Sequence, residues 1–357
     1  MFARLVAAGT AAMTLALSPA QAEAQESFEG ETIRVVINLG AGGATGVMAQ
    51  LVSRYWSEHL DGDPDFVVDS VTGGGQLRGI IEARNAAPDG RTLSFVSWSA
   101  PTRRIGPPEQ DIDWSEFDVI GGMGAQAMTY MRRDVGDGVE RPEDIVEVEG
   151  VRIGGYRPGS YLDLMARLSL DLLEVDHEYT TGFGGGADIV AALQRDEVNL
   201  HTGPAANYFG SIEENVVEEG IGIPMWYFPL TGPDGEPQLD EAFGDIPPFH
   251  ELYETLKGEA PSGPLWESLK FLNDGASGMT WFIAAPAGVD ETRLEALRAS
   301  FLAATQDPEF LREAEELTGL VPTTHAPEQM LQFLEELENV DPEVASTLNE
   351  YIETGTN

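Results

Sequence analysis

The chain has 357 residues, 42% of them apolar, and its 20 basic and 61 acidic side chains give a formal charge of 20 − 61 = −41. A chain of this length and composition can build about two packed domains, which excludes a disordered acidic tail. The absence of cysteine excludes disulfide frameworks, cysteine-ligated metals, thiol nucleophiles and a lipid anchor on cysteine. Because the chain has only two lysines, it also lacks the basic clusters that nucleic-acid binding requires.

Residues 1–22 have the pattern of a cleavable signal peptide. Arg4 precedes an apolar run, Leu5 to Leu17, and Ala20-Gln21-Ala22 fits the small-x-small rule for cleavage. The alternative is a membrane anchor, but the run is shorter than the roughly 20 residues that span a bilayer. We therefore expect an exported protein whose mature form, from Glu23, has a charge of 19 − 61 = −42.

Strands and helices are predicted to alternate through the first hundred residues. The apolar run Ile33–Leu39 ends in the glycine-rich segment Gly40–Gly46, and apolar residues at helical spacing follow. The same order recurs with the strand Phe66–Asp69, the loop Gly73–Gly75 and a second helix, before a third strand at Thr92–Val96. This succession predicts a parallel sheet with helices on its faces.

A second set of elements begins in the middle of the chain. Gly159-Ser160 and the run Gly184–Gly186 each precede a helical pattern, and the residues after about 290 are mostly helical. Further strands are predicted at Ala127–Arg132, Val151–Gly154, Val198–Thr202 and Met279–Ala285. Each half of the chain therefore has two helices that begin at glycines.

Glycine loops at helix starts favour anions, since their backbone N–H groups and the helix dipole both attract negative charge. Four such starts facing one cleft can hold a carboxylate without lysine. A dinucleotide site is an alternative, because Gly40, Gly42 and Gly46 precede an acid, Asp69, that closes the next strand. A third interpretation is that the glycines only permit tight turns.

The order of these segments resembles the Bug and TctC type substrate-binding proteins of tripartite tricarboxylate transporters, over almost the whole mature chain. The segment VINLGAGGATG (Val36–Gly46) is similar to the family's first loop, and DSVTGGGQLRG (Asp69–Gly79) to its second. The turn APDGRTL (Ala87–Leu93) and the segment WFIAAPAGVDETRLEAL (Trp281–Leu297) also match. The chain departs from the family pattern where Ala41 replaces a proline and Gly46 an aspartate that can contact the ligand.

The resemblance implies an α/β fold of the type II periplasmic-binding-protein kind, in which two lobes with parallel-rich sheets and flanking helices enclose a ligand cleft. Lobe 1 would comprise residues 28–127 and 281–357, and lobe 2 residues 128–280. The protein would be a periplasmic monomer without cofactor that delivers a small organic anion, a di- or tricarboxylate or an aromatic acid, to the permease subunits of an ion-coupled transporter.

The resemblance also implies a set of binding residues. Those that would hold one carboxylate from lobe 1 are Gly42, Gly43, Ala44, Thr45, Gly74, Gly75 and Gln76. Those that would hold the far end of the ligand from lobe 2 are Ser160, Gly184, Gly185 and Gly186. Arg78 is the charged candidate, with a surface ion pair as its alternative role. Trp98 is a candidate for stacking on the ligand, with core packing as the alternative.

The sequence does not favour an enzyme. Its five histidines show no metal-ligand spacing, so no metal site is predicted, and a Gly-x-Ser-x-Gly elbow is missing. The alternatives that stay open are a dinucleotide-binding oxidoreductase and a module that senses the same anion.

The acid excess predicts that salt stabilises the fold, as in proteins adapted to a saline exterior. Raising sodium chloride from about 0.05 M to 1 M shortens the Debye length from more than 10 Å to about 3 Å and screens repulsion between carboxylates. We expect the melting temperature of the ligand-free protein to rise. A flat or falling curve would contradict this interpretation.

Overall fold

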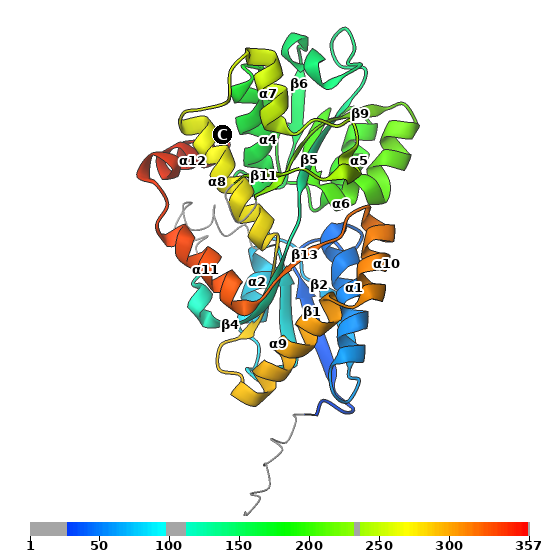
Figure 1. Cartoon of the computed structure of the whole chain (residues 1–357), viewed down its shortest axis with the longest axis vertical. Coiled ribbons are helices and arrows are strands. Elements are labelled where there is room, and N and C mark those ends of the chain that lie inside the picture. The colour runs from blue at the N-terminus through cyan, green and yellow to red at the C-terminus, as the bar shows by residue number, and fades with distance from the viewer. Residues whose placement is uncertain (1–26, 98–111, 232–235, 356–357) are drawn as a thin grey trace, which may run out of the picture.

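The structure is a computed structural model that describes residues 27–97, 112–231 and 236–355. Two lobes, each a mixed β-sheet with helices packed on it, lie one above the other in Figure 1. No helix in these three ranges combines the length and apolar composition needed to cross a bilayer. The predicted signal peptide lies outside the described residues.

The lower lobe in Figure 1, lobe 1, has six strands in the order β13-β4-β12-β3-β1-β2. These are β1 (Thr32–Ile37), β2 (Asp65–Ser70), β3 (Thr92–Val96), β4 (Phe117–Gly124), β12 (Trp281–Pro286) and β13 (Thr323–His325). β1 pairs in parallel with β2 and β3, whereas β12, β4 and β13 pair antiparallel.

Alternation along β12 places side chains on both faces of this sheet. Trp281 and Ile283 join a core with α1 (Ala44–His59), α9 (Glu291–Thr305) and α10 (Pro308–Thr318). Phe282 and Ala284 join a second core with α2 (Leu77–Arg84) and α11 (Pro327–Glu338). Helices therefore cover both faces of the first sheet.

Lobe 2 has five strands in the order β7-β6-β8-β5-β9. These are β5 (Ala127–Arg132), β6 (Val151–Gly154), β7 (His177–Thr180), β8 (Leu200–Pro204) and β9 (Gly222–Phe228). The helices between and after these strands are α4 (Tyr161–Leu172), α5 (Gly186–Gln194), α6 (Ala205–Asn207), the π-helical segment η4 (Tyr208–Glu218), α7 (Phe249–Lys257) and α8 (Pro264–Met279). Its short elements are η3 (Pro142–Glu147), η5 (Glu241–Phe243), and the pair β10 (Leu230–Thr231) and β11 (Pro237–Gln238). One more short element, η2 (Trp114–Glu116), directly precedes β4 of lobe 1.

Both sheets have the same topology, and each contains one strand that follows directly after the chain has crossed from the other lobe. β6 pairs in parallel with β7 and β8, as β1 does with β2 and β3. β5 then lies beside β8, as β12 lies beside β3. The chain crosses through Ala125 and Gln126 before β5, and through Thr280 before β12. The Ala125 N–H donates to the Thr280 hydroxyl at 3.1 Å, which joins the two crossings. The α/β fold expected from the sequence is confirmed.

The carboxyl-terminal helix α12 (Pro342–Thr354) packs on lobe 2, although the sequence grouped residues 281–357 with lobe 1. Val344, Leu348 and Ile352 form one apolar stripe at a spacing of four and enter the core of lobe 2 against α4 and α8. Because other helices already cover both faces of the first sheet, this stripe is buried on the second lobe instead.

A hydrogen bond between α1 and β12 gives a test of how lobe 1 holds the returning strand. The Trp281 indole N–H donates to the Thr45 hydroxyl at 2.9 Å, and both side chains are buried. Thr45→Val leaves this donor unpaired, so we expect the free energy of unfolding, measured with urea, to fall by about 1–3 kcal/mol. Thr45→Ser keeps the hydroxyl and is the control. Equal losses in both variants would contradict a role for the hydrogen bond.

Candidate functional site

Loops at the carboxyl ends of the parallel strands in the two lobes meet at one place. A Cβ atom built on Gly75, after β2, would lie 3.4 Å from the Cδ atom of Arg157, after β6. A Cβ atom on Gly185, after β7, would lie 3.9 Å from the backbone nitrogen of Gly40, after β1. Open α/β sheets bind ligands beyond the carboxyl ends of their strands. We therefore take the boundary between these loops as the candidate site.

The loop after β2 has a left-handed backbone at four successive residues. Gly73, Gly74, Gly75 and Gln76 have φ angles of 111°, 60°, 61° and 72°. Glycine adopts such angles without strain, but for Gln76 the conformation costs roughly 1–2 kcal/mol. Gln76 caps α2, its side chain is buried, and its Oε1 atom has no hydrogen-bond partner among the described residues. Strain of this kind concentrates at functional sites.

Asn38 holds the loops after β1, β2 and β3 together. Its Nδ2 atom donates to the carbonyl oxygens of Gln76 (3.3 Å) and Ser97 (2.9 Å), and its Oδ1 atom accepts from the Ser97 N–H (2.9 Å). Ser97 precedes Trp98, the residue proposed to stack on the ligand, which lies outside the described residues. A single buried amide thus fixes the relative position of three loops.

The loop after β1 folds back over Gly46. Gly43 caps α1, and Ala44, Thr45 and Gly46 in its first turn are buried, whereas Gly42 is exposed. A Cβ atom at Gly46 would lie 2.1 Å from the carbonyl oxygen of Ala41. No side chain fits there unless the loop moves. This close approach explains why glycine stands where the family's aspartate was expected.

Arg157 is the charged side chain that the structure places between the lobes. It is 7% exposed, and its three guanidinium nitrogens have no hydrogen-bond partner within the described ranges. Burial lowers its pKa to about 10, an effect that Asp163 and Tyr179 partly offset. Because Arg157 stays protonated at neutral pH, the site contains a buried positive charge with unused donors, which fits a carboxylate.

Asp163, on α4, fixes the backbone of Arg157. Its Oδ2 atom accepts from the Arg157 N–H at 3.0 Å and from the Tyr179 hydroxyl at 2.7 Å. Burial raises the pKa of Asp163 to about 6, against the lowering effect of hydrogen bonds from Tyr179, the Arg157 N–H and Ser160. The carboxylate of Asp163 therefore orients the loop through the backbone of Arg157, while the three guanidinium nitrogens make no hydrogen bond within the described residues.

The start of α5 adds polar groups on the same side of the site. Gly185 caps the helix and Gly186 begins it, while Gly184 before them is exposed. A Cβ atom on Gly186 would lie 2.9 Å from Nδ2 of Asn207 and 3.4 Å from the hydroxyl of Tyr156. Glycine here leaves room for these two side chains beside the helix start.

The structure thus brings the predicted glycine loops of both lobes together. Of the other predicted residues, Ser160 is buried as the cap of α4. Arg78, in the first turn of α2, is exposed, whereas Arg157 is buried. Residues that the sequence analysis missed are Asn38, Tyr156, Arg157 and Asn207. A signal was present for Arg157, because it stands three residues before Ser160 in the same predicted strand-to-helix loop.

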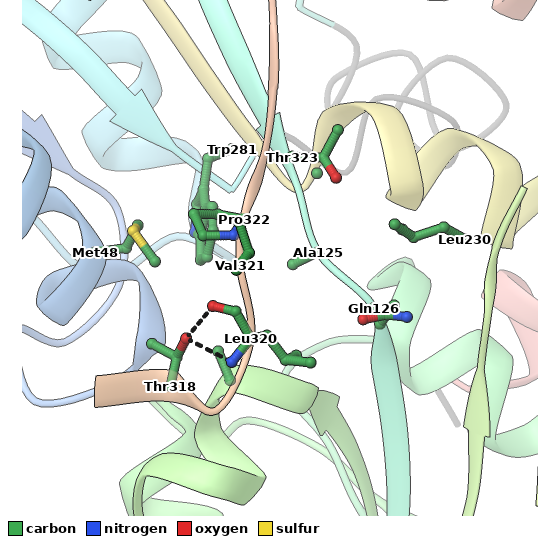
Figure 2. Close-up of a pocket in the computed structure, with 12 residues that line it drawn as sticks. Met48, Ala125, Gln126, Leu230, Trp281, Thr318, Leu320, Val321, Pro322 and Thr323 are labelled. Carbon is green, nitrogen blue, oxygen red and sulfur yellow. Dashed lines mark hydrogen bonds between the residues drawn. The ribbon is translucent and has the colours of Figure 1, made fainter. Parts of the chain in front are cut away.

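An opening, shown in Figure 2, lies where the chain crosses between the lobes. Met48 and Trp281 line one side of it and Leu230 the other, with Ala125 and Gln126 between them. Its volume of about 20 Å³ suits a single water molecule and is too small for an organic acid. Among the described residues, no group of three or more metal-ligating side chains comes together.

Comparison with known proteins identifies similar sequences and folds. No protein-family profile matches the chain. The UPF0065 protein in the gbd 5′ region of Cupriavidus necator is 37% identical over 109 residues, which are 30% of this chain and 32% of that protein. The chain thus matches about a third of the length of this relative.

Solved structures resemble the chain over most of its length. The periplasmic binding protein BugD has a TM-score of 0.68 at 18% identity, covering 91% of this chain and 98% of that one. MatC (Rpa3494) of Rhodopseudomonas palustris with bound malate has a TM-score of 0.65 at 17% identity over 91% and 100% of the two chains. R. palustris Rpa4515 with adipate has a TM-score of 0.69 at 16% identity over 89% and 97%. The resemblance to Bug and TctC type binding proteins is confirmed at the level of the fold.

His201 lies beneath the Arg157 loop and gives a pH test of the packing there. Its Nδ1 atom is 2.8 Å from the carbonyl oxygen of Gly154, and the rings of Tyr130 and Tyr156 pack edge-on against it. Burial lowers its pKa from about 6.5 to about 4. The folded protein therefore binds fewer protons than the unfolded chain between these pH values, so protonation of His201 in the unfolded chain increasingly opposes folding as the pH falls below about 6.5.

We expect acidification from pH 7.5 to 5.0 to lower the unfolding free energy of the wild type by about 2 kcal/mol more than that of His201→Gln. Urea unfolding at both pH values measures the difference. Asp163 titrates in both proteins, so its opposite contribution cancels. Identical pH dependence in the two proteins would show that His201 is not buried in its neutral form.

Proposed function

We propose that this protein is an exported solute-binding protein that holds a small organic carboxylate between its two lobes and delivers it to a membrane permease. The observation that carries the proposal is the buried guanidinium of Arg157, which lies against the glycine loop of lobe 1 with no hydrogen-bond partner within the described ranges. A planar guanidinium matches a carboxylate with two parallel hydrogen bonds.

The ligand would contact both lobes. In lobe 1, the helix starts at Gly43 and Gln76 offer backbone N–H groups and positive dipole ends to one acidic group. In lobe 2, Arg157 would pair with a second acidic group, beside the helix start at Gly185. This division favours a dicarboxylate over a monocarboxylate, because each lobe then meets its own negative charge.

The similar structures support this ligand class, since MatC is described with malate and Rpa4515 with adipate. A ligand that touches both lobes binds the closed arrangement better than the open one, and this difference in affinity drives closure. In this proposal the protein is located in the periplasm, where it delivers the ligand to the permease subunits of an ion-coupled tripartite transporter.

The alternative of a dinucleotide site receives less support. Asp69, the acid that would bind a ribose, accepts hydrogen bonds from Nε (2.9 Å) and Nη2 (2.6 Å) of Arg34. An acid held in this way by a neighbouring strand has a structural partner already. A sensing module would use the same cleft, and binding experiments do not separate it from a transporter component.

Arg157→Met is the direct test of the proposed function. Titration calorimetry with malate and adipate should show affinity at least about tenfold lower than in the wild type, since charged hydrogen bonds are lost. Without ligand, the variant should be as stable as the wild type or more stable, because a buried unpaired charge has been removed. Wild-type protein at a ligand concentration 100 times Kd should gain about 2.7 kcal/mol of stability.

Arg78→Met is the matched control, because Arg78 is an arginine of the same region that is exposed. We expect its affinity to change less than about twofold, as for a screened surface charge. If no mono-, di- or tricarboxylate, aromatic acids included, stabilises the wild type, the proposed function is wrong. If Arg78→Met and Arg157→Met lose affinity equally, the assignment of Arg157 is wrong.

A further inference from the structure

The carboxyl-terminal end of α12 packs against the loop that carries Arg157. A Cβ atom on Gly355, directly after α12, would lie 3.1 Å from Cβ of Pro158, the residue next to Arg157. It would also lie 3.3 Å from Cε1 of Tyr179 and 2.9 Å from Nη1 of Arg167. A side chain at this position would crowd all three neighbours, so glycine allows α12 to end directly on the binding loop.

Arg167, on α4, connects α12 to β7. Its Nη1 atom donates to the Tyr351 carbonyl oxygen at 2.6 Å, and its Nη2 atom donates to the Thr354 hydroxyl at 3.1 Å. Its guanidinium carbon lies 5.0 Å from the ring centres of both Tyr351 and Tyr179. Since Arg167 is 8% exposed, these contacts with α12 and Tyr179 are made away from solvent, where hydrogen bonds and cation–π contacts are strongest.

Tyr179 continues the connection to the binding loop. Its hydroxyl donates to Oδ2 of Asp163, and the same oxygen accepts from the Arg157 N–H. The space is tight, because a Cβ atom on Gly155 would lie 2.2 Å from that oxygen and 2.7 Å from Cε2 of Tyr179. Asp163 therefore cannot move without moving either the tyrosine ring or the backbone before Arg157.

We infer that the carboxyl-terminal helix positions Arg157 for its ligand through Arg167, Tyr179 and Asp163, which we call the carboxyl-terminal link. These are positioning residues, because none of them is assigned a contact with the ligand. The inference rests on the proposed function insofar as Arg157 binds a carboxylate. It adds that lobe 2 holds this carboxylate tightly only while α12 is docked.

Two tyrosine variants separate positioning from general stability. Tyr179→Phe removes the hydroxyl that donates to Asp163, within the link. Tyr351→Phe removes a hydroxyl that donates to Asp171, outside the link, and keeps the ring against Arg167. Both variants lose one tyrosine–aspartate hydrogen bond in lobe 2. We expect affinity for malate or adipate to fall about threefold to tenfold in Tyr179→Phe, and less than about twofold in Tyr351→Phe.

A double-mutant cycle with Arg157→Met tests whether the effect passes through Arg157. In that background, Tyr179→Phe should cause no further loss of affinity, because the group it positions is gone. Arg167→Lys keeps the charge but loses the paired hydrogen bonds that the guanidinium donates to α12, so it should also lower the affinity for the ligand, as Tyr179→Phe does. Losses that simply add to that of Arg157→Met, or equal losses in the two tyrosine variants, would overturn the inference.

Hydrogen exchange without ligand tests the link even if the proposed function fails. The amides of residues 155–160, above all that of Arg157, should exchange faster in Tyr179→Phe and Arg167→Lys than in the wild type and in Tyr351→Phe. Unchanged exchange in all three variants overturns the link. Faster exchange in Tyr179→Phe and Arg167→Lys, together with a wild type that binds no carboxylate, would support the link and reject the proposed function.

Discussion

Arg157 places a buried positive charge where the two lobes touch, and such a charge without a hydrogen-bond partner destabilises a folded protein until a counter-charge reaches it. The surrounding features suit that requirement. Asp163 binds the backbone of Arg157 and leaves its guanidinium nitrogens unpaired. The glycine loop of lobe 1 lies beside this side chain, since a Cβ atom on Gly75 would be 3.4 Å from Cδ of Arg157. In a chain with a net charge of −41, this concentration of donors is what the proposed anion would need to bind despite long-range repulsion.

Much of the fold could be predicted from local patterns. Short apolar runs identified β3, β5 and β6 with their observed limits, and the segment that became β12 nearly so. β7 was missed because its four residues, His177–Thr180, include no aliphatic side chain and alternate between partly buried and exposed. The docking of α12 was also missed, since an apolar stripe shows that a helix packs but not which lobe it packs on.

The site was predictable where backbone conformation requires a particular residue. Gly74 and Gly75 need glycine for their left-handed φ angles, and this requirement is visible in the sequence. Arg157 stands in a predicted loop, but its burial was not predictable, because it depends on a loop that is some 80 residues away along the chain and belongs to the other lobe. Arg78 looked equivalent by position, yet it faces solvent. Charge and glycine spacing identify candidate loops, whereas long-range packing decides which arginine lies between them.

The central position of β12 also constrains how the chain acquires its structure. β12 lies between β3 and β4, so the first sheet is interrupted until residue 281 and its neighbours have been made. Lobe 2 in turn needs α12, near the end of the chain, to complete its core. Neither lobe can finish folding until the segment that completes it has been made, β12 for lobe 1 and α12 for lobe 2. Contacts so distant in sequence slow folding, and they make the two lobes interdependent in reaching the native state.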